Sequence, residues 1–156
     1  MKSVVKSVGN IKLIVDHLDG KREEFFYKNS LLKNGRIALV SSLANQYGDN
    51  YDYFISKMLF GDGGTSGGVP KSVNSERTGL FGTTRASKPI IATIDPVVTT
   101  KLSILSVLSY DDANGFALNE MALQMDNGEL YSMATFPDFT KTSAQQLTWI
   151  WELNFI

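Results

Sequence analysis

The clearest hydrophobic pattern of the chain lies near its C-terminal end, in the segment LTWIWELNF. Apolar residues occupy every second position from Leu147 to Phe155, including Trp149 and Trp151. A period of two is typical of a β-strand that lays one face against a core. We therefore predict a C-terminal strand that is held inside a sheet.

Several apolar segments upstream also predict strands. Residues 11–15 and 22–27 flank the sequence HLDGK, whose Asp-Gly pair favours a tight turn, so they predict a hairpin. FALNEMALQM and ELYSMATF predict a second hairpin, because they lie on either side of Asp126-Asn127-Gly128. Further strands are expected in YDYFISKMLF and KPIIATID.

The segment VVTTKLSILSVLSY, residues 97–110, alternates only in part. Leu102 and Ile104 share one phase, whereas Leu105 and Val107 share the other. A shift of one residue is what a β-bulge produces, so we predict a bulge in this strand.

One segment, NSLLKNGRIALVSSLANQYG at residues 29–48, has helical periodicity instead. Leu32, Leu39 and Leu43 fall near one face of a helix. Gly35 costs about 1 kcal/mol relative to Ala inside a helix. The helix can therefore begin after Gly35 instead of at the Asn-Ser pair that opens the segment. Gly48 is its predicted stop.

Together these elements predict a mainly β protein. We expect an antiparallel β-sandwich or open barrel with one α-helix near the N-terminus. A chain of 156 residues fits one domain, and no repeat or linker divides it. The expectation is a single β-sandwich domain over residues 1–156, with an extended glycine-rich loop at residues 61–82.

The glycine-rich segment FGDGGTSGGVPKSVNSERTGLFG raises the question of a phosphate or metal loop. A P-loop requires Gly-Lys-Ser/Thr, where this chain has Gly68-Val69-Pro70. A calcium loop requires closely spaced oxygen ligands, but Asp62, Asn74 and Glu76 are widely spread. We therefore expect no metal and no cofactor here.

No local motif for catalysis is present in the sequence. His17 is the single histidine and lies beside a predicted turn, where a polar residue is ordinary. There is no G-x-S-x-G elbow, and the absence of cysteine excludes thiol nucleophiles, thiolate metal sites and disulfides. Trp149 and Trp151 could stack on bases or sugars, but strand spacing on an apolar face favours a core or interface position. We do not expect an enzyme.

The charge pattern limits the partners. Lys and Arg number 15 and Asp and Glu 16, with no basic cluster, which argues against nucleic acid. No apolar run approaches the roughly 20 residues that span a bilayer, and no signal peptide is evident, so we expect no membrane contact and synthesis in the cytoplasm.

From about residue 32 onward, the order of features resembles the N-terminal, virion-attaching domain of phage tail-collar fibre proteins. The likeness rests on four segments: KNGRIALVSSL, MLFGDGGTSGGVPKSVNSERTGLF, FALNEMALQMDNGELYSMATFPDFTKT and LTWIWELNFI. By this resemblance, the positions that match the family are Glu76-Arg77, Asn119-Glu120, residues 126–128 and Lys141-Thr142.

The resemblance implies a bacteriophage virion structural protein without catalysis or cofactor. Its partners would be other virion proteins and copies of itself in a ring or lattice, after synthesis in the host cytoplasm. In the family a fibre shaft usually follows, whereas this sequence ends at Ile156. We therefore expect a tail, collar or baseplate component or a fibre-attachment adaptor. A capsid decoration (cement) protein is one alternative, and a carbohydrate- or surface-binding module with exposed Tyr51, Tyr53 or Tyr131 is another.

Within the loop we predict an arm that contacts a neighbouring protein. Leu80 and Phe81 would be its apolar anchors, and Arg77 a fork for carboxylate or carbonyl groups. Asp62 and Glu76 complete the predicted partner-binding residues. An arm of this composition can be mobile in the free protein and ordered on a partner.

Overall fold

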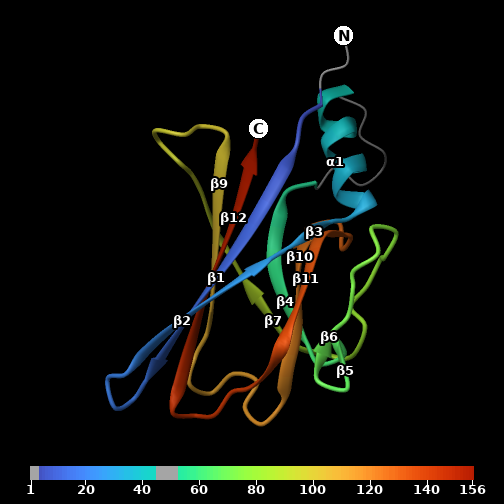
Figure 1. Cartoon of the computed structure of the whole chain (residues 1–156). Helices are drawn as coiled ribbons and strands as arrows, with labels where there is room; N and C mark the ends of the chain where they lie inside the picture. Colours follow the sequence, from blue (N-terminus) through green and yellow to red (C-terminus); the bar gives the residue numbers. More distant parts are fainter. Residues whose placement is uncertain (1–3, 45–52) are drawn as a thin grey trace.

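The computed structural model describes residues 4–44 and 53–156, which form two antiparallel β-sheets packed face to face with one helix (Figure 1). The elements are β1 Ser7–His17, β2 Arg22–Lys28, β3 Ser30–Leu31, α1 Lys33–Ala44, β4 Ile55–Gly61, β5 Thr65–Ser66, β6 Val69–Pro70, β7 Thr84–Pro89, β8 Ile91–Ile94, β9 Lys101–Leu108, β10 Ala117–Met125, β11 Leu130–Thr140 and β12 Gln145–Phe155. The predicted β-sandwich with one N-terminal helix is confirmed, and the sheets do not close into a barrel.

The first sheet has the strand order β2-β1-β12-β9-β8, so the C-terminal strand lies at its centre. Trp151 of β12 stands between Ile11 of β1 and Ile104 of β9 in the register of this sheet. The alternating residues of β12 from Leu147 to Leu153 are buried, as their period of two predicts. The second sheet has the order β3-β11-β10-β4-β7.

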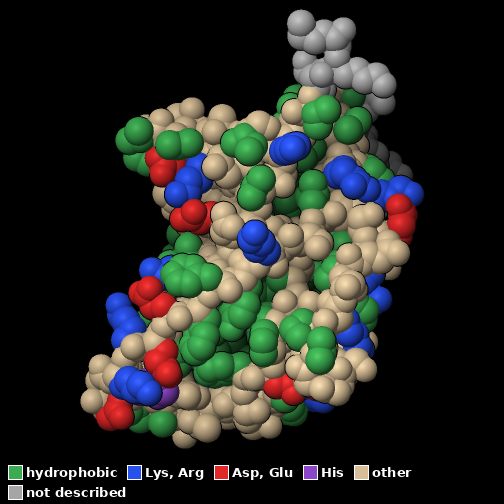
Figure 2. All heavy atoms as spheres, viewed as in Figure 1, with side chains coloured by type: hydrophobic (Ala, Val, Ile, Leu, Met, Phe, Trp, Pro, Cys, Tyr) green, Lys and Arg blue, Asp and Glu red, His purple; other side chains and the backbone are tan. Residues whose placement is uncertain are grey.

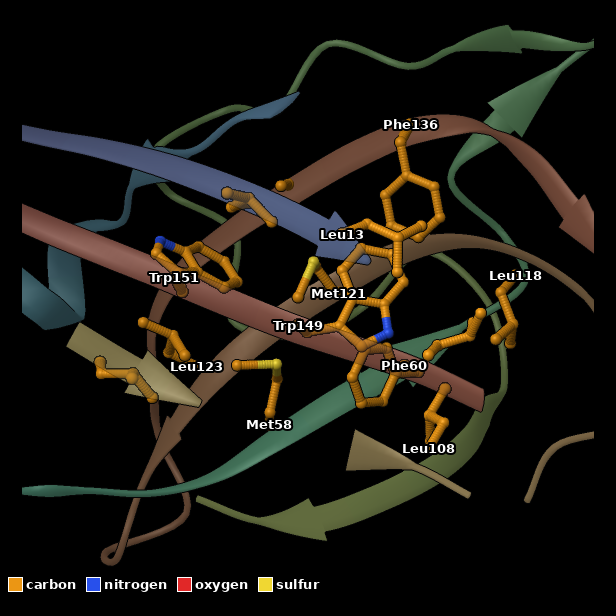
Figure 3. Packing of buried hydrophobic residues seen from close by; sticks show 14 of the residues in the cluster. Leu13, Met58, Phe60, Leu108, Leu118, Met121, Leu123, Phe136, Trp149 and Trp151 are labelled. Atoms are coloured by element: carbon orange, nitrogen blue, oxygen red, sulfur yellow. The ribbon is translucent and has the colours of Figure 1, made fainter. Parts of the chain in front are cut away.

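Aromatic rings fill the centre of the core between the sheets (Figure 3). Trp149 lies 5.4 Å from Phe60 and 5.2 Å from Phe136, measured between ring centroids. Both tryptophans are fully buried, which confirms their core assignment. Aromatic pairs at this spacing add to the stability gained from burial alone.

Both predicted hairpins are present, but the predicted β-bulge is wrong. β9 pairs with β12 and β8 without a register shift. Its inward positions are Ile104, Ser106 and Leu108, so a serine occupies a core position. The Ser106 hydroxyl donates to the Pro89 carbonyl at 3.0 Å, which satisfies it there. Leu105 and Val107 therefore belong to the outer face of a regular strand.

The segment KPIIATID forms two strands instead of one. β7 pairs with β4 in the second sheet, and β8 pairs with β9 in the first. The chain therefore crosses from one sheet to the other at Ile90, as strands do at the corners of sandwiches.

Helix α1 packs on β11 through its small residues. Gly35 and Ala38 are buried, whereas Leu39 and Leu43 are exposed, so the predicted leucine face is wrong for these two residues. A Cβ at Gly35 would lie 2.4 Å from the Tyr131 carbonyl oxygen. The glycine thus permits close contact between helix and sheet, and this contact outweighs its low helix propensity. The predicted stop at Gly48 lies outside the described residues.

In the second sheet, β10 and the adjoining parts of β4 and β11 are buried on both faces, whereas the edge strand β7 is largely exposed. Its outer face carries a separate apolar cluster formed by Leu32, Leu59, Ala122, Leu130 and Met133. Val73, Leu80 and Phe81 of the glycine-rich segment pack against this cluster. The segment therefore forms a third layer over the sheet, which explains the nearly continuous burial along β10.

Candidate functional site

The glycine-rich loop, residues 61–82, follows an ordered path over the outer face of the second sheet (Figure 1). Its first half contains a short hairpin of β5 and β6, which turns at Gly67 and Gly68. Both glycines have positive φ, at 57° and 78°, a conformation that other residues rarely adopt. The described loop is therefore a folded layer of the protein.

The carboxylate of Glu120 holds both ends of the loop together. Oε1 accepts hydrogen bonds from the backbone N–H groups of Gly63 and Gly82, each at 2.9 Å. Oε2 accepts the N–H of Phe81 at 2.7 Å. The Glu120 side chain comes from β10 and is fully buried, and these backbone donors satisfy it without a cation.

Asn119, the neighbour of Glu120, holds the start of the loop. Its Oδ1 accepts the N–H of Gly64 at 2.6 Å. Its Nδ2 donates to Thr65 Oγ1 and to Asp138 Oδ1, each at 3.0 Å. The Thr65 hydroxyl in turn donates to Asp138 Oδ1 at 2.7 Å. The bonds that Asp138 accepts from Asn119 and Thr65 lower the pKa of its carboxyl, because they favour the charged form.

Close backbone approach explains two of the glycines. A Cβ at Gly64 would lie 2.3 Å from the Asn119 carbonyl oxygen, and a Cβ at Gly63 would lie 2.2 Å from the Gly82 nitrogen. No side chain larger than hydrogen fits at either position without a shift of backbone. The absence of side chains therefore lets the N–H groups of Gly63 and Gly64 reach Glu120 and Asn119 of β10. These N–H groups bind side chains of the protein itself.

Asp62 joins the loop to β7. Its Oδ1 accepts the N–H of Thr83 at 3.0 Å, and its Oδ2 pairs with the Arg85 guanidinium. The bond to Arg85 is the main cause that lowers the pKa of the Asp62 carboxyl. Arg85 also lies over the Phe116 ring, 4.2 Å from its centroid.

Two cations flank the Phe81 ring on the loop. The Arg77 guanidinium lies 3.6 Å from the ring centroid, and Lys71 Nζ lies 4.9 Å from it. Arg77 also donates to the carbonyl groups of Gly79 and Leu80, at 3.2 and 3.1 Å. The ring and the guanidinium are thus held in one arrangement, both partly buried.

Glu76 links the loop to the first turn of α1. Its carboxylate lies 3.1 Å from Lys33 Nζ, and the N–H of Lys33 donates to the Ser75 carbonyl at 2.8 Å. Both charged side chains are more than half exposed, so the ion pair itself contributes little to stability.

The five predicted partner-binding residues thus all lie on the folded loop. Leu80 and Phe81 also pack on the protein's own apolar cluster. Sequence reasoning did not identify Arg85 or assign a site role to Asn119 and Glu120, although the last two match family positions. The available signal was a polar Asn-Glu pair inside an otherwise apolar predicted strand.

The histidine and the tyrosines considered from the sequence lie apart from the glycine-rich loop in the chain. His17 Nε2 lies 2.7 Å from Glu23 Oε2 across the first hairpin, and this contact lowers the pKa of the Glu23 carboxyl. Tyr131 is buried and Tyr53 is half-buried, whereas Tyr51 lies outside the described residues. Over residues 4–44 and 53–156, no group of acidic or histidine side chains could hold a metal ion.

The one helix of the described chain is too short and too polar to cross a bilayer.

Comparison with known proteins gives one positive result. The sequence profile of the family described as "Phage tail-collar fibre protein, N-terminal" matches residues 33–149. This range contains α1, the glycine-rich loop, Asn119 and Glu120. No curated protein and no solved structure gives a significant match. The family is a structural domain of phage tails and not an enzyme family. The matched range covers most of the chain, and the protein therefore belongs to the phage tail-collar fibre family as a structural protein of the phage tail.

Proposed function

We propose that this chain is a tail, collar or baseplate component, or a fibre-attachment adaptor, that works by protein-protein assembly. The glycine-rich loop forms its contact surface toward a neighbouring virion protein. Family membership supports the tail as the location. No reaction is part of this function.

The observation that carries the proposal is the pre-arranged surface around Phe81. Arg77 is stacked on the Phe81 ring and bonded to loop carbonyl groups, while Glu120 fixes the Phe81 backbone. A surface that is already ordered loses little conformational entropy on binding. Aromatic and arginine side chains are also the types that most often dominate the energy of protein interfaces.

The two predicted acidic residues add charge beside this surface. Glu76 and Asp62 are carboxylates on the same loop, each paired with a cation of the protein itself. Paired charges at a rim steer association and select partners more than they add affinity. We propose that they set the orientation of the neighbour.

The test compares incorporation of loop variants into phage particles. Arg77→Ala and Phe81→Ala should each reduce the copy number per particle at least about tenfold, the loss expected for a hot-spot residue. Thr78→Ala, at an exposed position of the same loop, is the matched control and should incorporate normally. Each purified variant is also unfolded thermally. Normal incorporation with a lowered unfolding temperature would contradict the proposal, because the loop would then be only a cover for the sheet.

A further inference from the structure

The open edge of the first sheet at β2 is a second surface with distinct properties. β2 has seven residues and is the longest of the four strands at the edges of the two five-stranded sheets, since β7 has six, β8 four and β3 two. In the described structure, no strand pairs with its outer side (Figure 1). A long open edge with apolar side chains is a template for pairing with another strand.

The hydrogen-bond pattern of the first hairpin shows which backbone groups face this edge. The N–H of His17 donates to the Lys21 carbonyl at 2.9 Å, so these two residues form a hydrogen-bonded pair. Bonded and non-bonded pairs alternate along an antiparallel ladder. The odd-numbered residues of β2 therefore bond to β1. The backbone groups of Glu24, Phe26 and Lys28 consequently point toward the open edge.

The side chains of these three residues place opposite charges at equal distances along the strand on either side of Phe26. Phe26 is 70% exposed, and exposed residues of opposite charge stand two positions before and after it. Glu24 also lies 3.3 Å from Lys12 Nζ of the neighbouring strand. Acidic and basic side chains alternate along this edge in the space-filling view (Figure 2).

We propose that β2 pairs antiparallel with β2 of a second copy of this chain, about a two-fold axis at Phe26. Glu24 then lies opposite Lys28 of the second copy, and this ion pair occurs twice. Phe26 lies opposite itself, and Phe25 lies opposite Tyr27. Such an isologous contact joins the two first sheets into one continuous sheet.

Charge selects this register over its neighbours. If the strand of the second copy slides by two residues in one direction, Arg22 lies opposite Lys28 of the second copy. If it slides by two more residues, Glu24 lies opposite Glu24 of the second copy. Like charges directly opposite each other are unfavourable. The shift in the other direction places Phe26 opposite Lys28 and loses both ion pairs. In the proposed register, residues 24–28 of the two copies are paired, and both charged residues of this segment lie opposite a residue of opposite charge.

A shallow hollow lies beside the proposed axis. It is lined by Asn10, Ile11, Phe26, Tyr27 and Lys28. The Phe26 ring of the second copy can cover its apolar residues. The edge thus offers a complementary surface in addition to backbone groups.

The first test uses two charge reversals and their mixture in sedimentation velocity. Lys28→Glu places Glu opposite Glu at both pairs, and Glu24→Lys places Lys opposite Lys, so each variant alone should dimerise at least about tenfold more weakly than the wild type. Mixed together, the two variants regain both ion pairs and should form a heterodimer. A purely structural role of either residue would not produce this recovery.

The second test uses the absence of cysteine from the chain. Phe26→Cys places two thiols opposite each other on the axis, at a Cα separation of about 5.5 Å, which a disulfide can bridge. It should form a disulfide-linked dimer under mild oxidation. Ile94→Cys, on the exposed edge strand β8, is the control and should remain largely monomeric.

Two results would overturn the proposal. One is a wild-type protein that stays monomeric up to about 1 mM, the weak end of specific association. The other is Phe26→Cys that cross-links no faster than Ile94→Cys. The β2 edge and the glycine-rich loop belong to different sheets, so failure of one interface leaves the other untouched.

Discussion

The Oε2 atom of Glu120 accepts the backbone N–H of Phe81 at 2.7 Å, from a position 39 residues away in the sequence. The same carboxylate accepts the N–H groups of Gly63 and Gly82. One buried side chain of β10 thus gathers the two ends of the glycine-rich loop. The contact surface around Phe81 depends on this arrangement.

Replacement of Glu120 by Gln should loosen the loop. The amide has one acceptor oxygen in place of two, and its NH2 group would face backbone donors, so one or two buried N–H groups lose their partner. We expect a loss of about 1–3 kcal/mol in the free energy of unfolding. Hydrogen exchange should also speed up at Gly63, Phe81 and Gly82.

Glu129→Gln is the control for this substitution, because Glu129 is an exposed carboxylate on the turn between β10 and β11. It should leave unfolding and exchange unchanged. Equal stability of Glu120→Gln and the wild type would mean that the carboxylate does not hold the loop.

Gly64→Ala should be costly, whereas Gly79→Ala should be tolerated. The added Cβ at Gly64 would meet the Asn119 carbonyl oxygen at 2.3 Å, and the chain there is packed on Glu120. Overpacking of this kind costs about 1–3 kcal/mol. At Gly79 nothing lies within 4 Å of the added atom. Chemical denaturation of both variants measures the difference, and similar costs at the two positions would contradict the close packing of the loop.

Acid should weaken the attachment of the loop through Asp62 and Asp138. The pKa of each carboxyl is lowered in the folded protein, by the bond to Arg85 and by the bond to Asn119, respectively. A lowered folded pKa means that the stabilisation is present above the ordinary Asp value of about 3.9 and is lost as pH falls through the folded pKa. Stability should therefore change little from these groups between neutral pH and about 5, and fall below about 4.

The measurement is the midpoint of urea unfolding as a function of pH, for the wild type and for a double variant that carries Asp62→Asn and Asp138→Asn. The double variant should have a smaller decrease below about pH 4. Parallel curves for the two proteins would exclude these carboxyls as the cause of acid sensitivity.

Lys141 is expected to be a structural cation. Its side chain is fully buried, and Nζ donates to the Tyr110 carbonyl at 3.1 Å and to Asn114 Oδ1 at 2.7 Å. Burial lowers the pKa of its ammonium group. Lys141→Met keeps much of the volume but leaves these oxygens unpaired, at a cost of about 1–3 kcal/mol in unfolding experiments. An unchanged unfolding free energy would show that the bonds contribute nothing.

Local patterns in the sequence were sufficient for the central strand and both hairpins. The strict alternation from Leu147 to Leu153 predicts β12 because a core strand needs one apolar face. The Asp-Gly and Asn-Gly pairs predict the turns because they accept positive φ, as Gly20 and Gly128 do here. Each of these signals is contained in a few neighbouring residues.

Features that depend on distant contacts could not be predicted in this way. The core position of Ser106 is satisfied by the carbonyl of Pro89 in another strand, so the sequence of β9 alone suggested a bulge. The close packing of Gly35 on Tyr131 leaves Leu39 and Leu43 exposed, although their spacing predicted a buried face. The role of Glu120 requires three backbone donors from a loop that precedes it by up to 57 residues. No short motif encodes such contacts.

The most direct test of the central claim is quantitative mass spectrometry of purified particles of the phage that encodes this chain. The protein should be present at a small ratio to the major capsid protein, consistent with a few rings of a tail, collar or baseplate. A ratio approaching one would indicate a capsid decoration protein instead and would contradict the tail assignment. Absence from the particles would contradict the structural role itself.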